Sequence, residues 1–168
     1  MCSLEKRGRL FLLRLTGDGE HRLNPTLLES ISSNINRIRS DPSSSRSVLI
    51  TTADGKFFSN GYDLALTESD PSLPSLMDAK LRSLVADIIS LPMPTIAAVT
   101  GHASAAGFIL AMSHDYILMR RDRGFLRDVM LTAAKLTADQ GLEMGIVESA
   151  HGGSGVGYFN CLRDGNGN

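Results

Sequence analysis

The sequence predicts an α/β fold built around a parallel sheet. Short apolar runs of strand length alternate along the chain with longer segments whose apolar residues recur at helical spacing. Two of the short runs, SVLITT and TIAAVT, have the continuous apolar character of parallel strands covered on both faces. A length of 168 residues is enough for one domain with a substantial buried core.

The first part of the chain has the order of a strand–helix–strand unit. Arg9–Thr16 is expected to be a strand that ends at a glycine turn. Asn24 is placed to cap a helix, and Pro25 stands at the first helical position, where its missing N–H costs nothing. The apolar spacing that follows predicts a helix over Pro25–Ser40, and Ser47–Thr52 is the next strand.

The remaining elements continue the alternation. Asp54–Leu66 is a loop containing glycine that runs into another element, and a small-residue turn spans Gly101–Gly107. We expect helices over Ser75–Ser90, from Phe108–Ser113 onward and over Val129–Gly141, and strands at Thr95–Thr100 and Asp115–Arg120. Gly152–Asn168 is rich in glycine and asparagine without periodicity, which predicts a disordered tail.

Composition excludes several classes of function. Seventeen Lys and Arg against eighteen Asp and Glu give a net charge of −1, which argues against a nucleic-acid binder. The sequence has no apolar run long enough to span a membrane and no recognisable signal peptide. Cys2 and Cys161 form neither a metal-ligand spacing nor a disulfide framework, so a reducing compartment is expected.

Two loops are the candidates for chemistry. Each follows a strand, contains glycine or alanine and leads toward a helix. Two backbone N–H groups aimed at one point from such loops would form an oxyanion hole. Small residues at strand–helix turns are more commonly explained by tight packing, so local sequence alone leaves both explanations open.

The sequences of the two loops resemble the two signatures of the crotonase (enoyl-CoA hydratase/isomerase) superfamily. FFSNGYDL, at residues 57–64, is similar to the first signature, and AVTGHASAAG followed by LAMSHD, at residues 98–115, is similar to the second. The resemblance extends over Arg9–Phe125. It implies an α/β fold of the crotonase-like ββα spiral type, which we expect to be incomplete at the C-terminal side.

The resemblance also implies a site and a substrate. Members of this superfamily bind an acyl-CoA thioester and stabilise its enolate, and the CoA belongs to the substrate, so no separate cofactor or metal is expected. By alignment, the oxyanion-hole N–H groups belong to Tyr62 and Ala106. The residues expected to contact substrate are Asn60, Gly61, Asp63, Leu64 and Gly107. Asp63 is expected to hold its loop by hydrogen bonds rather than to act as a base.

The general base is missing from this alignment. Hydratases of the superfamily carry a glutamate where this chain has Ile109, and isomerases use a different glutamate in a segment after the fourth strand. This chain has no residues that correspond to that segment, which would fall between Leu126 and Arg127. The sequence is therefore interpreted as a crotonase-like domain over residues 1–151, shortened near 126/127, with an altered tail over residues 152–168. The expected family is the plant-type Δ3,Δ2-enoyl-CoA isomerases of fatty-acid β-oxidation.

Several alternatives remain open at this stage. The chain is either an isomerase or a catalytically silent, acyl-CoA-binding isoform that joins oligomers of a full-length enzyme. If it is an isomerase, Glu143 and Glu148 are the candidates to replace the missing base. A Clp-type peptidase would need its serine at Ala105, so Ser104 is interpreted as a turn residue. Family analogy places Lys56 and Lys80 near the CoA. The location implied by the family is the peroxisome, although the terminal Asn-Gly-Asn is not a peroxisomal signal, so the cytoplasm is the alternative.

Overall fold

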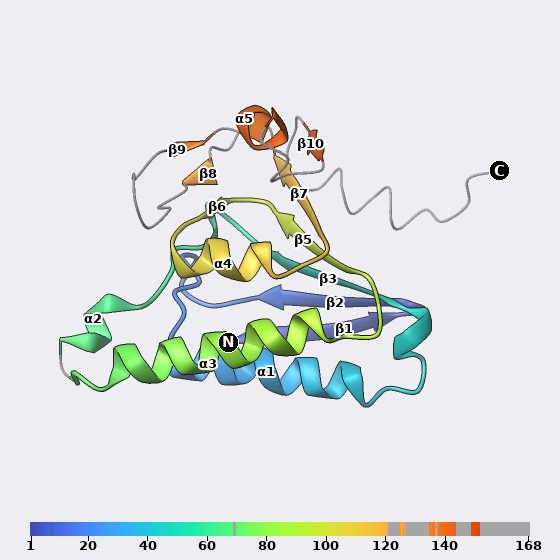
Figure 1. The fold of residues 1–168 in the computed structure, drawn as a ribbon, viewed down its shortest axis with the longest axis horizontal. Helices are drawn as coiled ribbons and strands as arrows, with labels where there is room; N and C mark the ends of the chain where they lie inside the picture. Colours follow the sequence, from blue (N-terminus) through green and yellow to red (C-terminus); the bar gives the residue numbers. More distant parts are fainter. Residues whose placement is uncertain (69, 121–124, 127–134, 137, 144–148, 152–168) are drawn as a thin grey trace.

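A six-stranded sheet forms the centre of the molecule, with the strand order β1-β2-β3-β5-β7-β10 (Figure 1). The computed structural model describes residues 1–68, 70–120, 125–126, 135–136, 138–143 and 149–151. β1 and β2 form an antiparallel hairpin, and every other neighbouring pair in the sheet is parallel. The strands are β1 (Cys2–Arg7), β2 (Leu10–Leu15), β3 (Val48–Ala53), β5 (Thr95–Val99), β7 (Tyr116–Arg120) and β10 (Ser149–His151).

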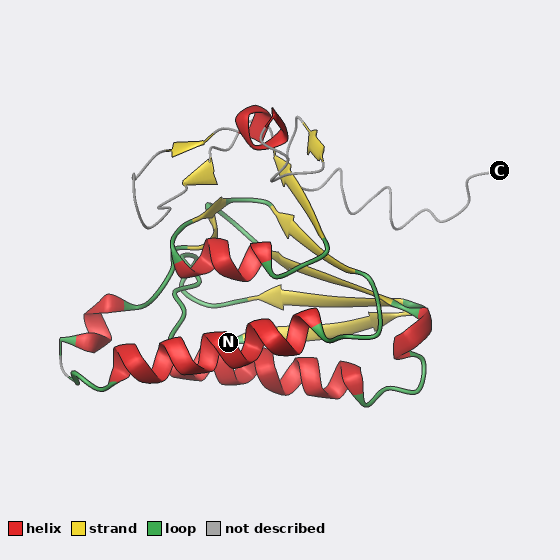
Figure 2. Cartoon of the chain, viewed as in Figure 1, coloured by secondary structure: helices red, strands yellow, loops and turns green. Residues whose placement is uncertain are grey.

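Helices cover one face of this sheet (Figure 2). The helices on this face are α1 (Pro25–Arg39), α3 (Leu73–Ile89) and α4 (Ala106–Met112). The short helix α2 (Leu64–Thr67) contacts α3, α5 (Ala138–Glu143) contacts β10, and a 3₁₀ turn spans Ser44–Arg46. Two small ladders complete the described structure. One pairs β4 (Phe57–Ser59) with β6 (His102–Ala103) in parallel, and the other pairs β8 (Phe125–Leu126) with β9 (Lys135–Leu136) antiparallel.

The helix expected after Asn24 forms with the expected cap. The Asn24 Oδ1 accepts a hydrogen bond from the backbone N–H of Leu27 at 2.8 Å, and Pro25 is the first helical residue. The buried face of α1 repeats at helical spacing, and α1 and α3 lie side by side. The residues of α1 that this face buries are Leu27, Leu28, Ile31, Asn34, Ile35 and Ile38. Tertiary burial of this apolar face, rather than helix propensity, is what stabilises such a helix.

The two faces of the sheet have different partners because successive strand residues point in opposite directions. On β2, Leu13 and Leu15 face the helices and belong to the main core. Leu12, Ile50 and Ala98 form a second, smaller apolar cluster on the opposite side; Leu12 of β2 is paired with Ile50 of β3, and Ala98 of β5 lies two residues after Ile96, the partner of Ile50. Apolar residues are therefore buried on both faces of the central strands, which explains why these strands are continuous apolar runs in the sequence.

Most of the expected elements are present, within one or two residues of the expected bounds. The α/β fold is confirmed, while β1, β4, β6 and α2 were not anticipated as separate elements. The expected helix over Val129–Gly141 is wrong at Lys135–Leu136, which pairs as a strand with Phe125–Leu126, and is confirmed from Ala138, where α5 begins. The expected omission at 126/127 and the expected tail, Gly152–Asn168, lie outside the described residues.

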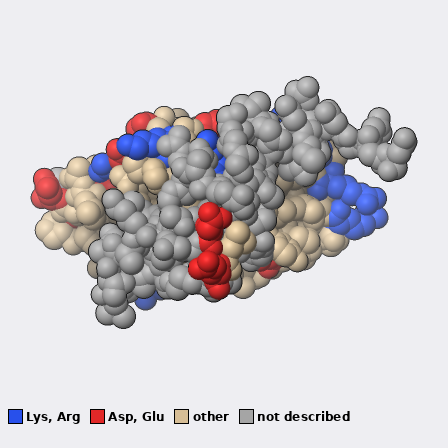
Figure 3. Space-filling view, turned by 90° about the horizontal axis from the view of Figure 1, so that it is seen from above, with Lys and Arg blue, Asp and Glu red and all other residues tan. Residues whose placement is uncertain are grey.

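The surface agrees with the near-neutral composition. In the view from above, the basic and acidic side chains of the described residues form separate small groups (Figure 3). Among the helices that the structure describes, none combines the length and apolarity needed to cross a lipid bilayer.

His114 is a buried polar group that links α4 to the sheet. Its ring nitrogens lie 3.0 Å from the Leu110 carbonyl oxygen and 2.8 Å from the Thr51 Oγ1. Burial lowers the pKa of His114 from 6.5 to about 4, so the ring is neutral in the folded protein at neutral pH.

This burial makes stability depend on pH. Between pH 6.5 and about 4 the unfolded chain binds a proton that folded His114 does not, so the free energy of unfolding falls as the pH falls through this range. We expect His114→Gln to remove this part of the slope in urea titrations measured from pH 7.5 to 4.5. At pH 7.5 the ring is neutral in both the folded and the unfolded state. The difference in unfolding free energy between the two proteins at this pH is the reference for the other pH values. Parallel curves for the two proteins over the whole range would contradict the assignment.

Candidate functional site

The two loops singled out in the sequence leave the same end of one small ladder. β4 leads into Asn60–Asp63 and then α2, and β6 leads into Ser104–Ala105 and then α4. Because β4 and β6 are parallel neighbours, both loops emerge side by side. The Ser104 N–H donates to the Ser59 carbonyl oxygen at 3.0 Å and extends this pairing to the start of the second loop.

Two glycines allow the second loop to approach the first strand. A Cβ on Gly107 would lie 2.5 Å from the Ser59 carbonyl oxygen, and a Cβ on Gly101 would lie 2.5 Å from the Lys56 carbonyl oxygen. Real Cβ atoms do not approach oxygen this closely, so any larger residue would push the second loop away from β4. Gly107 therefore acts through packing: it seats the first turn of α4 against Ser59.

Gly61 brings the first loop against the second. Its φ of +80° is a conformation that favours glycine, and a Cβ there would lie 3.1 Å from the Ser104 carbonyl oxygen and 3.6 Å from the Ala106 nitrogen. The Gly61–Tyr62 backbone thus runs directly beside the start of α4. The structure thus places Gly61, the residue before Tyr62, against Ser104–Ala106 of the second loop.

In the first loop, every backbone N–H group but that of Tyr62 has a hydrogen-bond acceptor among the described residues. The Asn60 N–H donates to the Glu20 carbonyl oxygen, and the Gly61 N–H donates to the Ser59 Oγ. The Asp63 N–H donates to the Leu23 carbonyl oxygen. The Gly61 carbonyl oxygen accepts from the Leu23 N–H at 2.7 Å. Among the described residues, no acceptor takes the Tyr62 N–H. Backbone donors in such a position are normally paired, so an unpaired one beside another loop is a candidate for ligand binding.

The second loop leaves a matching N–H. Ala105 has φ 45° and ψ −120°, an unusual conformation for a residue with a side chain, and Ala106 is the first residue of α4. The N–H groups of Gly107 and Ile109 donate to the carbonyl oxygens of Ser104 and Ala105, at 2.8 and 3.2 Å. Within the part of the chain that the structure describes, the Ala106 N–H has no acceptor.

The side chains expected to contact substrate have different surroundings. The Asn60 amide donates to the Glu20 carboxylate at 3.0 Å, whereas the Leu64 side chain is 64% exposed at the start of α2. Asp63 precedes α2, which begins without a side-chain cap, and its backbone N–H donates to the Leu23 carbonyl oxygen at 3.0 Å. Tyr62 is half-buried against the core, and burial raises the pKa of its phenol.

The remaining candidates are placed as follows. Ser104 is buried, and its Oγ has no hydrogen-bond partner among the described residues, which fits a turn residue rather than a nucleophile paired with a base. Lys56 lies beside the loops, over the Phe57 ring. Lys80 instead pairs with Glu29 in a polar groove of about 970 Å³ lined by α1, α3 and residues 40–42. Glu143 is exposed on α5, and Glu148 lies outside the described residues.

Sequence reasoning missed a third segment of the site. Residues Asp18–Leu23 lie along the first loop, and Leu23 forms a parallel bridge with Tyr62. The Ser59 hydroxyl donates to the His21 carbonyl oxygen at 2.8 Å. The only local signal was the cluster of glycine and charged residues before Asn24, which does not reveal a partner about 40 residues away.

Comparison with known proteins matches this arrangement to one family. The family described as enoyl-CoA hydratase/isomerase matches residues 20–128, which include both loops and most of the segment beside them. The chain belongs to the enoyl-CoA hydratase/isomerase family. It is 70% identical to "Enoyl-CoA delta isomerase 1, peroxisomal" of Arabidopsis thaliana, over 90% of this chain and 75% of that protein. It is 43% identical to "Enoyl-CoA delta isomerase 2, peroxisomal" of the same plant, over 89% of this chain and 77% of that protein.

Solved structures confirm the crotonase fold of this family member. An enoyl-CoA hydratase of Mycobacterium smegmatis superposes with a TM-score of 0.86 at 20% identity, covering 96% of this chain and 73% of that one. A Legionella pneumophila structure titled as a putative enoyl-CoA hydratase/isomerase (crotonase) gives 0.84 at 19% identity, covering 96% and 74%. At this level of identity the likeness concerns the fold alone.

The contact between the two loops can be tested with a pair of matched glycines. Gly61 and Gly55 have similar φ angles, +80° and +87°, but a Cβ on Gly55 would meet nothing within 4 Å. Gly55→Ala is expected to cost about 1–2 kcal/mol of unfolding free energy from backbone strain alone. Gly61→Ala should cost a further ~1–3 kcal/mol because its methyl group meets the second loop. Equal losses for the two variants in urea titrations would show that the loops do not press on each other at Gly61.

Proposed function

We propose that this chain binds an acyl-CoA thioester and stabilises its enolate, the chemistry of a Δ3,Δ2-enoyl-CoA isomerase. The observation that carries the proposal is the pair of backbone N–H groups, on Tyr62 and Ala106, left without acceptors on adjacent loops. The 70% identity to a protein named an enoyl-CoA delta isomerase supports the substrate class. Fatty-acid β-oxidation is the process in which 3-enoyl-CoA would be converted to trans-2-enoyl-CoA.

The reaction moves one proton and one double bond. A base removes a proton from C2 of the 3-enoyl thioester, and the electron pair delocalises onto the thioester oxygen as an enolate. Return of the proton to C4 shifts the double bond from C3–C4 to C2–C3, with no net oxidation. The two N–H groups would donate to the oxygen where negative charge develops, which is the position at which fixed donors lower a barrier most.

The other site residues are assigned supporting roles. Gly61 and Gly107 permit the close approach of the loops, and Asn60 and Asp63 flank the Gly61–Tyr62 donor segment. The exposed Leu64 side chain would contribute an apolar contact for the substrate. We assign no separate cofactor, because both bond changes occur within the thioester.

Ile109 favours isomerisation over hydration. It lies one turn after Ala106 on α4 and is 40% exposed. An aliphatic side chain at this position has no group to activate water, whereas the hydratases that the sequence resembles carry a glutamate there. Addition of water across the 2,3 double bond would therefore lack its acid–base partner.

The base for the C2 proton is proposed to be missing from this chain. The alignment with the 70% identical isomerase spans 181 positions, more than the 168 residues present here, so that relative has residues with no counterpart in this chain. This supports an internal omission, which we place between Leu126 and Arg127. Such a chain would retain thioester binding and enolate stabilisation and lose most of its turnover.

Two biological proposals follow from the relatives. Two of the similar isomerases are named peroxisomal, so we propose the peroxisome as the location of this chain. A silent binding isoform that assembles with a full-length isomerase is the second candidate function, and the positions of the relative that have no counterpart here favour it.

The oxyanion hole can be tested without the base. Acetoacetyl-CoA forms an enolate with its own ultraviolet absorbance, so its enolate fraction at saturating protein reports how strongly the site stabilises the charge. Ala106→Pro removes one donor at the first helical position, where proline is tolerated, and Ala106→Ser keeps that N–H. We expect Ala106→Pro to weaken enolate stabilisation by about 10²–10³-fold, the size of effect seen when one oxyanion donor is lost. Unchanged stabilisation in Ala106→Pro would exclude this N–H as a donor.

The missing base can be tested by restoring the omitted residues. We expect the chain to isomerise a 3-enoyl-CoA slowly or not at all, although it binds acetoacetyl-CoA. Insertion of the corresponding residues of the 70% identical isomerase between Leu126 and Arg127 should restore turnover, and replacing the glutamate of the insert by glutamine should abolish it again. Full turnover by the chain as it stands would instead require one of its own carboxylates to be the base.

A further inference from the structure

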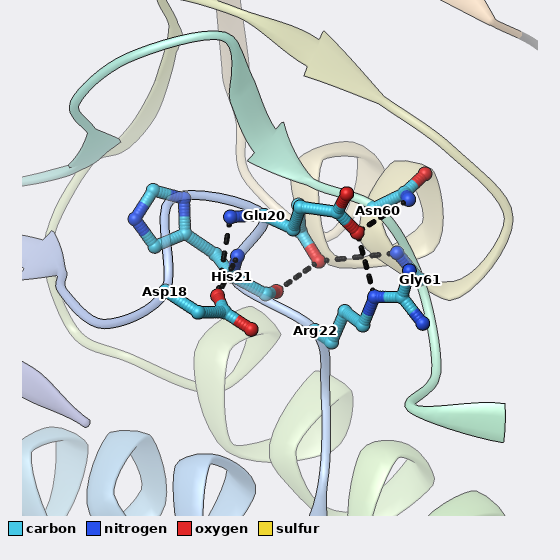
Figure 4. Close-up of polar contacts among 7 residues, drawn as sticks. Asp18, Glu20, His21, Arg22, Asn60 and Gly61 are labelled. Carbon is cyan, nitrogen blue, oxygen red and sulfur yellow. Dashed lines mark hydrogen bonds and ion pairs between the residues drawn. The ribbon is translucent and has the colours of Figure 1, made fainter. Parts of the chain in front are cut away.

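Residues Asp18–Leu23, here called the strap, hold the first loop of the site from one side (Figure 4). The Asp18 carboxylate accepts hydrogen bonds from the N–H groups of Glu20 and His21, at 3.1 and 3.0 Å, and so fixes the turn of the strap itself. His21 is buried, with a φ of 47°, and its Nδ1 lies 3.0 Å from the Phe57 carbonyl oxygen. These hydrogen bonds fix the conformation of the strap independently of its contacts with the first loop.

Glu20 contacts Asn60 through both its backbone and its side chain. The Asn60 N–H donates to the Glu20 carbonyl oxygen at 2.9 Å, and the Asn60 Nδ2 donates to the Glu20 Oε2 at 3.0 Å. One hydrogen bond leaves the loop free to turn about it, whereas two bonds to the same residue fix both position and orientation. Asn60 is two residues before Tyr62, and only Gly61 separates it from the peptide bond that carries the Tyr62 N–H.

Arg22 offsets the charge that Glu20 brings to the site. Its Nε lies 2.6 Å from the same Oε2, so the carboxylate is neutralised within the strap. An unpaired carboxylate near the two donors would repel an enolate by like charge. The Glu20–Arg22 pair removes most of that repulsion while keeping the oxygen that holds Asn60.

We infer that Glu20 is a positioning residue, which aims the Tyr62 N–H through Asn60, and that Arg22 serves to neutralise it. This inference rests on the proposed oxyanion hole and adds a role that neither loop signature contains. It also changes the expected role of Asn60, whose amide is engaged by the strap instead of by substrate.

Glu20 is poorly suited to be the missing base itself. Hydrogen bonds from Asn60 and then Arg22 lower the pKa of its carboxyl group, so it holds a proton weakly. The Oε2 that would accept a proton from substrate already accepts two hydrogen bonds. The same contacts that make Glu20 a good anchor therefore make it a weak base.

The test compares three variants of the full chain. Glu20→Ala removes the side-chain bond to Asn60, Glu20→Gln keeps an acceptor without the charge, and Glu5→Ala is the matched control. Glu5 on β1 also pairs with an arginine two residues away, Arg7, at the same Nε–O distance of 2.6 Å. Two measurements are made on each: amide hydrogen exchange at residues 60–63 by NMR without ligand, and the apparent pKa of acetoacetyl-CoA bound at saturation.

Glu20→Ala is expected to raise amide exchange at residues 60–63 about tenfold and to raise the apparent pKa of the bound thioester by about one unit, as loss of one charge-assisted hydrogen bond implies. Glu20→Gln should largely restore both values, and Glu5→Ala should change neither. Unchanged exchange in Glu20→Ala overturns the positioning role, as does faster exchange with an unchanged pKa of the bound thioester.

Enolisation of acetoacetyl-CoA by the unmodified chain separates the failure of the two proposals. If the unmodified chain does not enolise acetoacetyl-CoA, the proposed function fails. The inference that Glu20 aims an oxyanion donor then fails with it, even where exchange shows that Glu20 orders the loop. If the unmodified chain enolises the thioester and Glu20→Ala does so equally well, only the role of Glu20 is refuted.

Discussion

Ser59 is the residue on which the site depends, because it touches all three segments that form it. Its hydroxyl donates to the His21 carbonyl oxygen and accepts from the Gly61 N–H, at 2.8 and 3.3 Å. Its carbonyl oxygen accepts from the Ser104 N–H and stands where a side chain on Gly107 would clash. Ser59 is completely buried, so water does not compete for these hydrogen bonds, and losing one would leave a polar group unpaired in the interior.

The sequence was informative where local rules determine the structure. The cap at Asn24 with Pro25 after it, and the apolar runs of β3 and β5, allowed α1 and the central strands to be placed closely. β1 was missed because Glu5, Lys6 and Arg7 are exposed and give it no apolar run. The pairing of residues 18–23 with the first loop was also missed, since contacts between residues about 40 positions apart leave no periodic signal in one sequence.

The same limit applies to the individual site residues. The loop sequences indicated Tyr62 and Ala106, and the structure places Gly61, the residue before Tyr62, against the second loop at Ser104–Ala106. The loop sequences gave no indication that Asn60 is held by Glu20. Small residues in a loop report that two backbones approach each other, whereas the partner of a polar side chain depends on the folded geometry.

β1 has a consequence for the solubility of the chain. It pairs with β2 along one side only, and along its other side its backbone N–H and C=O groups meet no described strand. Glu5, Lys6 and Arg7 place charges along this edge, and Lys6 is tied back to Asp41 at 2.8 Å, which discourages a second sheet from adding there. Without this charged strand, the apolar β2 would become the edge, and its Leu-Phe-Leu-Leu sequence would favour edge-to-edge aggregation. The least apolar strand of the sheet thus protects one of the most apolar.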